Sequence, residues 1–588
     1  MGARACLRCV SAGVLICLAW GLVRAEAPED RSTSEILDRL ERHPAALSGL
    51  RGARELWQSV SGPEPLPVRC GTQLALALHL REPSLHPLLR AGVQRLLSAP
   101  PGPHRVVAIE GFEWRLPSGD GLPIAGLGSR ELDDALRAAS EQASRALRYW
   151  SDDLGWLLPS ESASGRALPI YLSGTLPPGT EGLAIPVKEP ARTFEEDATA
   201  VLILSPRLVR DPEALAQVLI HQLAHAILWA YSHHEEPAWQ EASAVALEIE
   251  ARRDASPYIE IFGERLLARS VSLRSDRMRL AQGSGLWALF LDLSRPATGP
   301  ALRLLWEELA AVSGDNLSEA ADTTFATLDG SDLGQEVATY LAWGLFTGER
   351  DDGRHFPFGA ALPAAEPDAL HAAYPAQGSA RSVTLQPWSG YLLSLHSGEG
   401  PGGLRFEFQG QDSGRWRLLA LFESRDGGPL YSAEVPVDAG GGASLSFPWQ
   451  SVGAATLAIA YVSAPENGPG AFSYSVWHDP TYPYELAGLR AEPVPEGVTL
   501  SWTTLGETEL VGWNIYRSLP PSEGFVRVNR LSIPAGGNVR EPLNYLFLDA
   551  DSAAGKKYYY CLEGLTAGGF TQRSPRVSVR TLGTAPRR

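Results

Sequence analysis

Residues 211–230 read DPEALAQVLIHQLAHAILWA and predict a well-capped helix that lies in or beside a hydrophobic core. Asp211 is a favourable N-cap, and Pro212 is favourable at the first helical position. Most other residues of the stretch are apolar, so His221 and His225 stand out. Because they are four residues apart, both imidazoles lie on one face of the helix. The stretch therefore indicates either a pair of metal ligands or an ordinary helix with one half-buried and one surface histidine.

The segment HQLAH at 221–225 differs by one residue from the HExxH pattern of zinc peptidase helices, because Gln222 stands in place of the glutamate. Zn²⁺ binds two such histidine nitrogens readily, and a third protein ligand completes a catalytic site that keeps one position open for water. An amide cannot take up and pass on a proton, so Gln222 can only orient water by hydrogen bonding. The pattern predicts a metal site without its general base.

A second helix is predicted directly after a short polar turn at 231–236. It reads PAWQEASAVALEIE, residues 237–250, and begins with a proline. In a pair of helices joined by so short a turn, we expect Glu241 to face back toward the two histidines. Buried strands are predicted before the first helix, at 167–174 and 199–205.

The two helices together carry a family resemblance. HQLAHAILWAYSHHEEPAWQEASAVALE, residues 221–248, resembles the gluzincin arrangement HExxH…W-x-x-E-x-x-A…E, and it is similar to exported metalloproteases of the myxobacterial type. The similarity also takes in RCGT at 69–72 and WGLFTGERDDG at 343–353, and it covers about residues 65–480. It implies a zincin-like α+β domain.

The resemblance implies metal ligands at His221, His225 and Glu241, and a supporting carboxylate at Glu248. It places Gln222 at the catalytic position and implies Zn²⁺ as the cofactor, either retained or lost together with the base. Peptidase activity would then need an unconventional base. Four groups of the connecting turn are near enough in sequence to replace it, and a solvated role is predicted for each: His233, His234, Glu235 and Glu236.

Gluzincins also donate a hydrogen bond to the transition state from a side chain outside the two helices. Tyr258 and Tyr340 are the candidates for that role in this sequence. No spacing favours either one, so core packing is predicted for both.

The chain as a whole is predicted to be a multidomain α+β protein, in which the zincin-like domain precedes two antiparallel β-sandwich domains. Short alternating apolar runs separated by turn residues begin near residue 375 and predict the first sandwich. Near the C-terminus, GVTLSWTT, GWNIYRS and KKYYYCLEG resemble strands of a fibronectin type III domain, with Trp502 and Trp513 in its core. The predicted parts are a signal peptide (1–25), an N-terminal helical region (26–104), the zincin-like domain (105–374), a β-sandwich (375–480) and a fibronectin type III-like domain (481–588).

The composition limits the partners. The 588 residues carry a net charge of −17, from 68 acidic and 51 basic residues, which argues against nucleic acid. A basic start, a short apolar run and the small residues Ala25 and Ala27 predict an export signal, and therefore an extracellular or periplasmic location. No later stretch reaches membrane-spanning length. Removal of the signal leaves Cys70 and Cys561, either as a disulfide or as two buried thiols.

Three functions remain open from the sequence. The first is an exported pseudoenzyme that binds a protein, a peptide or a cell-surface polymer through its β modules. The second is an active zinc metallopeptidase with an unconventional base. The third is a protein in which the β modules carry all of the function and the helical half is only a platform.

Overall fold

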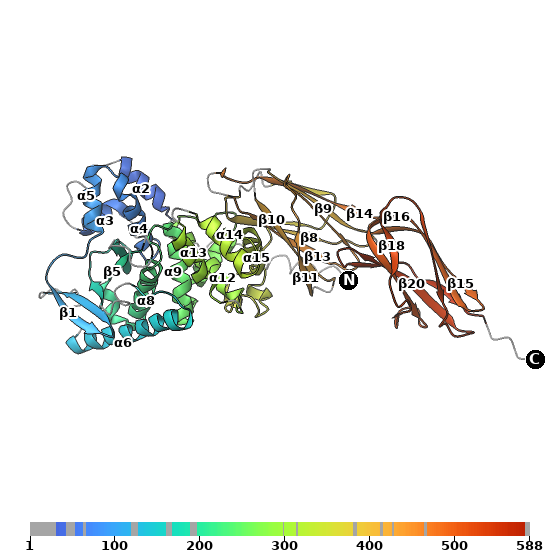
Figure 1. The fold of residues 1–588 in the computed structure, drawn as a ribbon, viewed down its shortest axis with the longest axis horizontal. Helices are drawn as coiled ribbons and strands as arrows, with labels where there is room; N and C mark the ends of the chain where they lie inside the picture. Colours follow the sequence, from blue (N-terminus) through green and yellow to red (C-terminus); the bar gives the residue numbers. More distant parts are fainter. Residues whose placement is uncertain are drawn as a thin grey trace, which may run out of the picture. The chain divides into compact units, whose positions relative to one another are not determined.

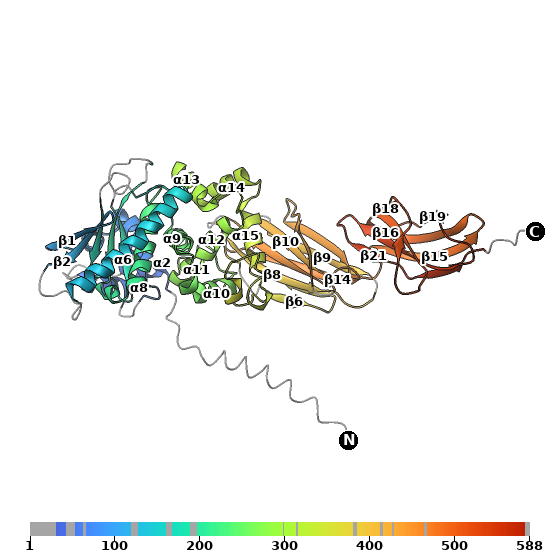
Figure 2. The ribbon, with the colours of Figure 1, turned by 90° about the horizontal axis from the view of Figure 1, so that it is seen from below.

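The structure is a computed structural model, and its ribbon is drawn in Figures 1 and 2. It describes residues 31–42, 53–62, 66–118, 128–159, 167–187, 194, 197–297, 299–312, 316–379, 385–400, 402–411, 415–425, 428–463 and 467–582. The predicted signal peptide lies outside these residues. Within them, no helix is long and apolar enough to cross a membrane.

Contacts divide the chain into two compact units. The first takes Met1–Leu267, Leu273–Ser331 and Gly353–Pro363, and the second takes Ala268–Ser272, Asp332–Asp352 and Ala364–Arg588. The first unit is mixed α/β and the second is mainly β. The predicted boundaries at residues 104, 374 and 480 are not tested by this division and stay predictions.

A five-stranded mixed sheet forms the centre of the first unit. Its order is β1-β2-β3-β5-β4, with β2, β3 and β5 parallel and an antiparallel strand at each end. The strands are β1 (His104–Ile109), β2 (Phe112–Pro117), β3 (Leu168–Leu172), β4 (Gly182–Val187) and β5 (Thr199–Leu204). Because side chains alternate along a strand, buried strands such as these carry an apolar set on each face.

Helices cover both faces of this sheet. On one face, Leu183 and Ile185 of β4 and Ile203 of β5 share a hydrophobic core with the N-terminal helices. These are α2 (Thr33–Arg42), α3 (Ala53–Ser61), α4 (Thr72–Arg81) and α5 (Pro87–Leu96). On the other side lie α6 (Ser129–Arg148) and α8 (Pro212–Leu228), which contact each other, and α8 also contacts β4 and β5. The N-terminal helices are therefore part of the same core as the sheet.

The rest of the first unit is helical. Here α9 (Pro237–Arg252) contacts α4, α8, α11 and α12. The other helices are α10 (Ile259–Leu267), α11 (Met278–Gly283), α12 (Gly285–Leu293), α13 (Ala301–Ala311) and α14 (Leu317–Leu328). Gly285 lets α12 approach α9 closely, since a Cβ atom at this position would lie 2.5 Å from Cγ1 of Val245.

We predict that Gly285→Ala destabilises the first unit by about 1–3 kcal/mol, because the added methyl group overpacks the contact between α12 and α9. Chemical denaturation monitored by tryptophan fluorescence measures the change. Gly174→Ala is the matched control, because nothing lies within 4 Å of a Cβ atom there. Equal stability of the two variants would contradict the prediction.

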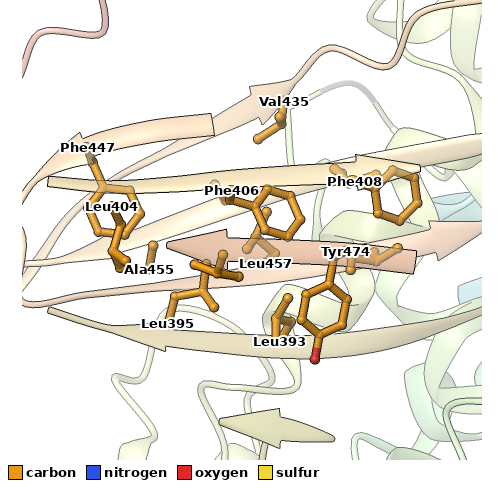
Figure 3. Packing of buried hydrophobic residues seen from close by; sticks show 14 of the residues in the cluster. Leu393, Leu395, Leu404, Phe406, Phe408, Val435, Phe447, Ala455, Leu457 and Tyr474 are labelled. Atoms are coloured by element: carbon orange, nitrogen blue, oxygen red, sulfur yellow. The ribbon is translucent and has the colours of Figure 1, made fainter. Parts of the chain in front are cut away.

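In the second unit, α15 (Leu333–Trp343) packs on β8, β10 and β13 of a β-sandwich. One sheet of the sandwich has the order β11-β10-β13-β8-β6, and the other β12-β9-β14-β7. Figure 3 shows Leu393 and Leu395 of β8 (Ser389–His396) in the same core as Phe406 and Phe408 of β9 (Gly403–Gly410). The remaining strands are β6 (Ala369–His371), β7 (Ala376–Ser379), β10 (Trp416–Glu423), β11 (Pro429–Val435), β12 (Gly442–Pro448), β13 (Ala454–Tyr461) and β14 (Phe472–Asp479).

The last strands form a separate sheet with its own core. Trp502 and Trp513 are both buried in that core, as predicted. Both tryptophans lie in β16 (Gly497–Ser518), a long strand that pairs with β15 (Tyr484–Val494) and β20 (Lys557–Thr566). The other strands are β17 (Val526–Arg527), β18 (Ile533–Val539), β19 (Leu543–Asp549), β21 (Thr571–Arg573) and β22 (Val577–Arg580). A β-sandwich-like C-terminal region is therefore confirmed.

Candidate metal centre

The helix predicted from residues 211–230 is α8, and it is capped as expected. The Asp211 side chain accepts a hydrogen bond from the backbone N–H of Ala214 at 3.1 Å. The helix is buried on all sides from Val218 to Leu228, and the exposed fraction is 4% for His221 and 0% for His225. The alternative of one half-buried and one surface histidine is therefore wrong, because the sheet and α9 together enclose the helix.

The turn after α8 directs α9 back along it. The Gln240 side chain accepts from the Trp229 indole N–H at 2.6 Å and donates to the backbone carbonyl groups of Glu235 and His233 at 3.0 and 3.2 Å. One buried amide thus ties the end of α8, the turn and the start of α9 together. The solvated role predicted for the turn is wrong for His233 and Glu235, which are buried, and Glu236 forms an ion pair with Arg274. No residue of the turn belongs to the ligand cluster found among the described residues.

Four side chains place ligand atoms within 4.8 Å of one another, and all four are buried. His221 Nε2 lies 3.5 Å from Glu241 Oε1. His225 Nε2 lies 3.3 Å from Glu241 Oε2 and 3.6 Å from Cys70 Sγ. A tetrahedron with metal–ligand bonds of about 2.0–2.3 Å has edges of about 3.3–3.8 Å. The cluster consists of Cys70, His221, His225 and Glu241.

The structure therefore brings together the three predicted ligands and adds a fourth, Cys70, that the sequence did not predict. The sequence predicts Cys70 only as a disulfide partner or a buried thiol. It forms no disulfide within the described residues, and neither does Cys561. Two facts could have indicated Cys70 as a ligand. It lies in RCGT at 69–72, which is part of the family resemblance, and thiolates bind Zn²⁺ well. The proximity of Cys70 to α8 depends on pairing with β4, which no local pattern reveals.

The ligand atoms fit a metal ion. His221 Nε2 and Glu241 Oε2 are buried and have no hydrogen-bond partner among the described residues. Buried polar atoms are rarely left in that state, and a cation between them supplies the missing interaction. The cluster can therefore hold a metal ion.

A second layer of polar groups orients the ligands. Glu248 Oε2 lies 3.1 Å from Nδ1 of His221, so with a metal bound that nitrogen would carry the proton and Nε2 would present its lone pair to the ion. Tyr258 donates its hydroxyl hydrogen to Glu248 Oε2 at 2.5 Å, and Gln282 donates to Glu241 Oε1 at 2.7 Å. Glu248 thus contacts one of the predicted ligands. The prediction for Tyr258 was incomplete, because its hydroxyl group takes part in the site.

We predict that Glu248→Gln lowers zinc affinity by about 10–100-fold, because the neutral amide holds the His221 proton less well. Competition with a chromophoric zinc chelator measures the affinity. Glu260→Gln, at an exposed position outside the ligand cluster, is the control. Equal affinity of both variants and the wild type would show that Glu248 does not orient His221.

Gln222 is held by hydrogen bonds on both sides of its amide. Thr72 Oγ1 accepts from the backbone N–H of Ala184 at 2.9 Å and donates to Gln222 Oε1 at 2.8 Å. Gln222 Nε2 then donates to Cys70 Sγ at 3.4 Å. Gly182 leaves room for this amide, since a Cβ atom there would lie 2.8 Å from Nε2. A carboxylate at position 222 could accept the hydrogen bond from Thr72 but could not donate one to Cys70.

Opposite charges control ionisation in the cluster. Burial and Glu241 act to raise the pKa of the Cys70 thiol, but His221 and His225 lower it to about 7. Burial also opposes ionisation of Glu241, and the two histidines nevertheless hold its pKa well below the ordinary value. Burial acts to lower the pKa of His221, whereas Cys70 and Glu241 raise it well above the usual value. The cluster thus favours anionic forms of Cys70 and Glu241 together with a protonated His221, and a bound cation would have to displace that proton.

A cavity of about 280 Å³ adjoins the cluster. His221, Gln222 and Tyr258 line it, together with Cys70. The site therefore has an adjacent space large enough for a small molecule.

Comparisons with known proteins assign no family. No protein-family model and no curated protein matches the sequence. Among solved structures, an Fn3-like protein from Clostridium thermocellum is 20% identical, and the match covers 18% of this chain and 96% of that one, with a TM-score of 0.13. The adhesin domain of Epf from Streptococcus pyogenes is 10% identical over 37% of this chain and 76% of that one, with a TM-score of 0.15. A GH2 β-galacturonidase from Eisenbergiella tayi is 11% identical over 35% of each chain, with a TM-score of 0.11. At these TM-scores the similarity assigns no function.

Proposed function

We propose that this chain is an exported, zincin-like zinc-binding protein whose metal site is closed by a fourth protein ligand and lacks peptidase activity. The observation that carries the proposal is the position of Cys70 Sγ within the cluster of the two histidines and Glu241. A catalytic zinc site keeps one position open for water, whereas a site with four protein ligands is typical of structural zinc. The lack of a general-base glutamate and the presence of a fourth protein ligand therefore both argue against peptidase activity.

The donor set supports Zn²⁺ over other common ions. A thiolate and two imidazoles are soft or borderline ligands, which Mg²⁺ and Ca²⁺ do not favour, and the four ligand atoms lie within 4.8 Å of one another. When bound, the metal would add its binding free energy to the stability of the first unit. Cys70, from the N-terminal part of the chain, would then be joined to α8 and α9.

Metal analysis of the purified, full-length protein tests the proposal. We expect about one equivalent of zinc per chain, and less than about a tenth would contradict it. Substitution by Co²⁺ identifies the ligands, because a thiolate ligand gives an intense near-ultraviolet charge-transfer band. We expect this band in the wild type and its loss in Cys70→Ser. A band that survives the substitution would mean that Cys70 is not a ligand.

Active zinc metallopeptidase remains the second candidate, and the adjoining cavity of about 280 Å³ is the observation that favours it. In this case Cys70 would leave the metal when substrate enters. A casein and peptide-library assay of the zinc-loaded wild type separates the two proposals. Turnover that is lost in His221→Ala would support the peptidase and contradict the closed site.

We also propose that the β-rich unit binds a peptide or a cell-surface polymer. A hollow of about 920 Å³ lies on the sheet β12-β9-β14-β7, and its lining includes Glu407, Gln409 and Ser473. Amide, carboxylate and hydroxyl groups of this kind suit a polar ligand such as a cell-surface polymer or a peptide. Co-sedimentation with insoluble polysaccharides tests this role, and we expect Glu407→Ala with Gln409→Ala to weaken retention. Equal retention of the variant would place the binding elsewhere.

A further inference from the structure

The strand β4 lies at the end of its sheet, next to the metal cluster. No described strand pairs with its outer edge, apart from a short bridge between Cys70 and Gly182. An exposed strand edge presents unpaired N–H and C=O groups and is a ready template for an extended peptide. A peptide can therefore bind beside the metal only if these groups of β4 are not already hydrogen-bonded within the chain.

The outward-facing N–H groups of Gly182 and Ala184 and the carbonyl group of Gly182 are already used within the chain. The Gly182 N–H donates to the Arg69 carbonyl at 3.3 Å, and the Gly182 carbonyl accepts from the Gly71 N–H at 3.0 Å. Two residues on, the Ala184 N–H donates to Thr72 Oγ1 at 2.9 Å. Outward donors recur every second residue, and the next position is Pro186, which has no N–H. The edge thus offers no free donor at these three positions.

The same short segment also closes the metal cluster. Arg69–Thr72 supplies the backbone partners of β4, the thiol of Cys70, and the hydroxyl group that holds Gln222. At the surface, an ion pair between Arg69 and Glu181 fixes the start of the segment. One segment of four residues therefore blocks both features that a peptide ligand would need, the strand edge and the fourth ligand position.

We infer that Arg69–Thr72 is an autoinhibitory segment, which occupies the place of an extended peptide and must leave before any peptide can reach the metal. The inference rests on the proposed zinc site. Its ligand class is an extended peptide that pairs with β4 and brings a metal-binding group to the position of Cys70 Sγ.

Two zinc-directed probes test the inference on the full-length, zinc-loaded protein. Acetohydroxamate needs only an open metal position, whereas a tetrapeptide hydroxamate also needs the strand edge. Gly71→Pro removes the N–H that pairs with Gly182, and Gly71→Ala keeps it as the matched control. If the closed state holds about 99% of the wild type, the tetrapeptide hydroxamate should bind Gly71→Pro about 100-fold more tightly than the wild type or Gly71→Ala.

Cys70→Ala opens the fourth ligand position and leaves the strand edge covered, so it separates the two effects. It should bind acetohydroxamate, while the tetrapeptide hydroxamate should gain little more, because the strand edge is still covered. Equal binding of the tetrapeptide hydroxamate by the wild type and Gly71→Pro would overturn the inference. The proposed function would stand in that case if the wild type contains zinc with thiolate ligation, whereas a wild type without zinc would remove both.

Hydrogen exchange on the wild type keeps the inference testable if Gly71→Pro does not fold. The amide hydrogens of Gly182 and Ala184 should be protected to the same extent as those that β5 donates to β4. Exchange at the rate of an exposed strand edge would overturn the inference without any variant.

Discussion

Replacement of His225 by alanine is expected to abolish stoichiometric zinc binding. The side chain is fully buried, and its Nε2 lies 3.3 Å from Glu241 Oε2 and 3.6 Å from Cys70 Sγ. Its loss removes one ligand and leaves the buried Glu241 carboxylate without one of its partners, so we expect about 3–5 kcal/mol of destabilisation as well. Metal analysis after dialysis against a zinc buffer measures the first effect, and urea denaturation the second.

His234→Ala is the control for this prediction. His234 lies in the exposed part of the turn after α8 and outside the ligand cluster, so its replacement should leave the zinc content unchanged. If His225→Ala keeps a full equivalent of zinc, the cluster is not the metal site. Collapse of the fold only when zinc is withdrawn from the wild type would show that the metal is structural.

Gln222→Glu combined with Cys70→Ala should give the largest gain of activity. The double variant opens the fourth position and restores a carboxylate that can act as a general base. That base should raise the hydrolysis of a blocked dipeptide amide by about 10²–10⁴-fold over Cys70→Ala alone. A dipeptide amide is the suitable substrate because the cavity of about 280 Å³ can hold it while Arg69–Thr72 still covers the strand edge.

Gln222→Glu alone should remain inactive. Its second carboxylate oxygen would face Cys70 Sγ at the place where the amide now donates a hydrogen bond. The new carboxylate and the Cys70 thiolate would repel each other at that distance, and Cys70 would still occupy the fourth ligand position. High activity of the single variant, equal to that of the double variant, would show that Cys70 does not close the site. Addition of His225→Ala to the double variant controls for metal-independent hydrolysis.

The structure changes the interpretation of Gln222. From the sequence it is a lost general base in an otherwise inherited motif. In the fold, its amide is a donor to Cys70 and an acceptor from Thr72, and a carboxylate could fill only one of these roles. The missing base and the extra ligand are therefore chemically matched, and neither is explained without the other.

Local sequence was sufficient for the two helices of the site and for the spacing of their ligands. Asp211 and Pro212 set the start of α8, and the four-residue spacing placed His221 and His225 on one face. A short turn returned α9, so that Glu241 and Glu248 met the histidines as expected. The alternating apolar runs after residue 375 likewise predicted the β-rich region. These features depend on residues close together in the chain, where capping and periodicity operate.

Only the tertiary structure decided which residue completes the cluster and what covers the strand edge. Cys70 reaches His225 because Arg69 and Gly71 pair with Gly182, and Tyr258 reaches Glu248 because α9 and the segment before α10 pack together. Cys70 and His225 are 155 residues apart in the sequence, and the geometry of their contact is set by strand pairing and core packing rather than by local preference. The sequence by itself determined a histidine pair on a buried helix with two carboxylates opposite it, and the long-range pairing of one short segment closed that site.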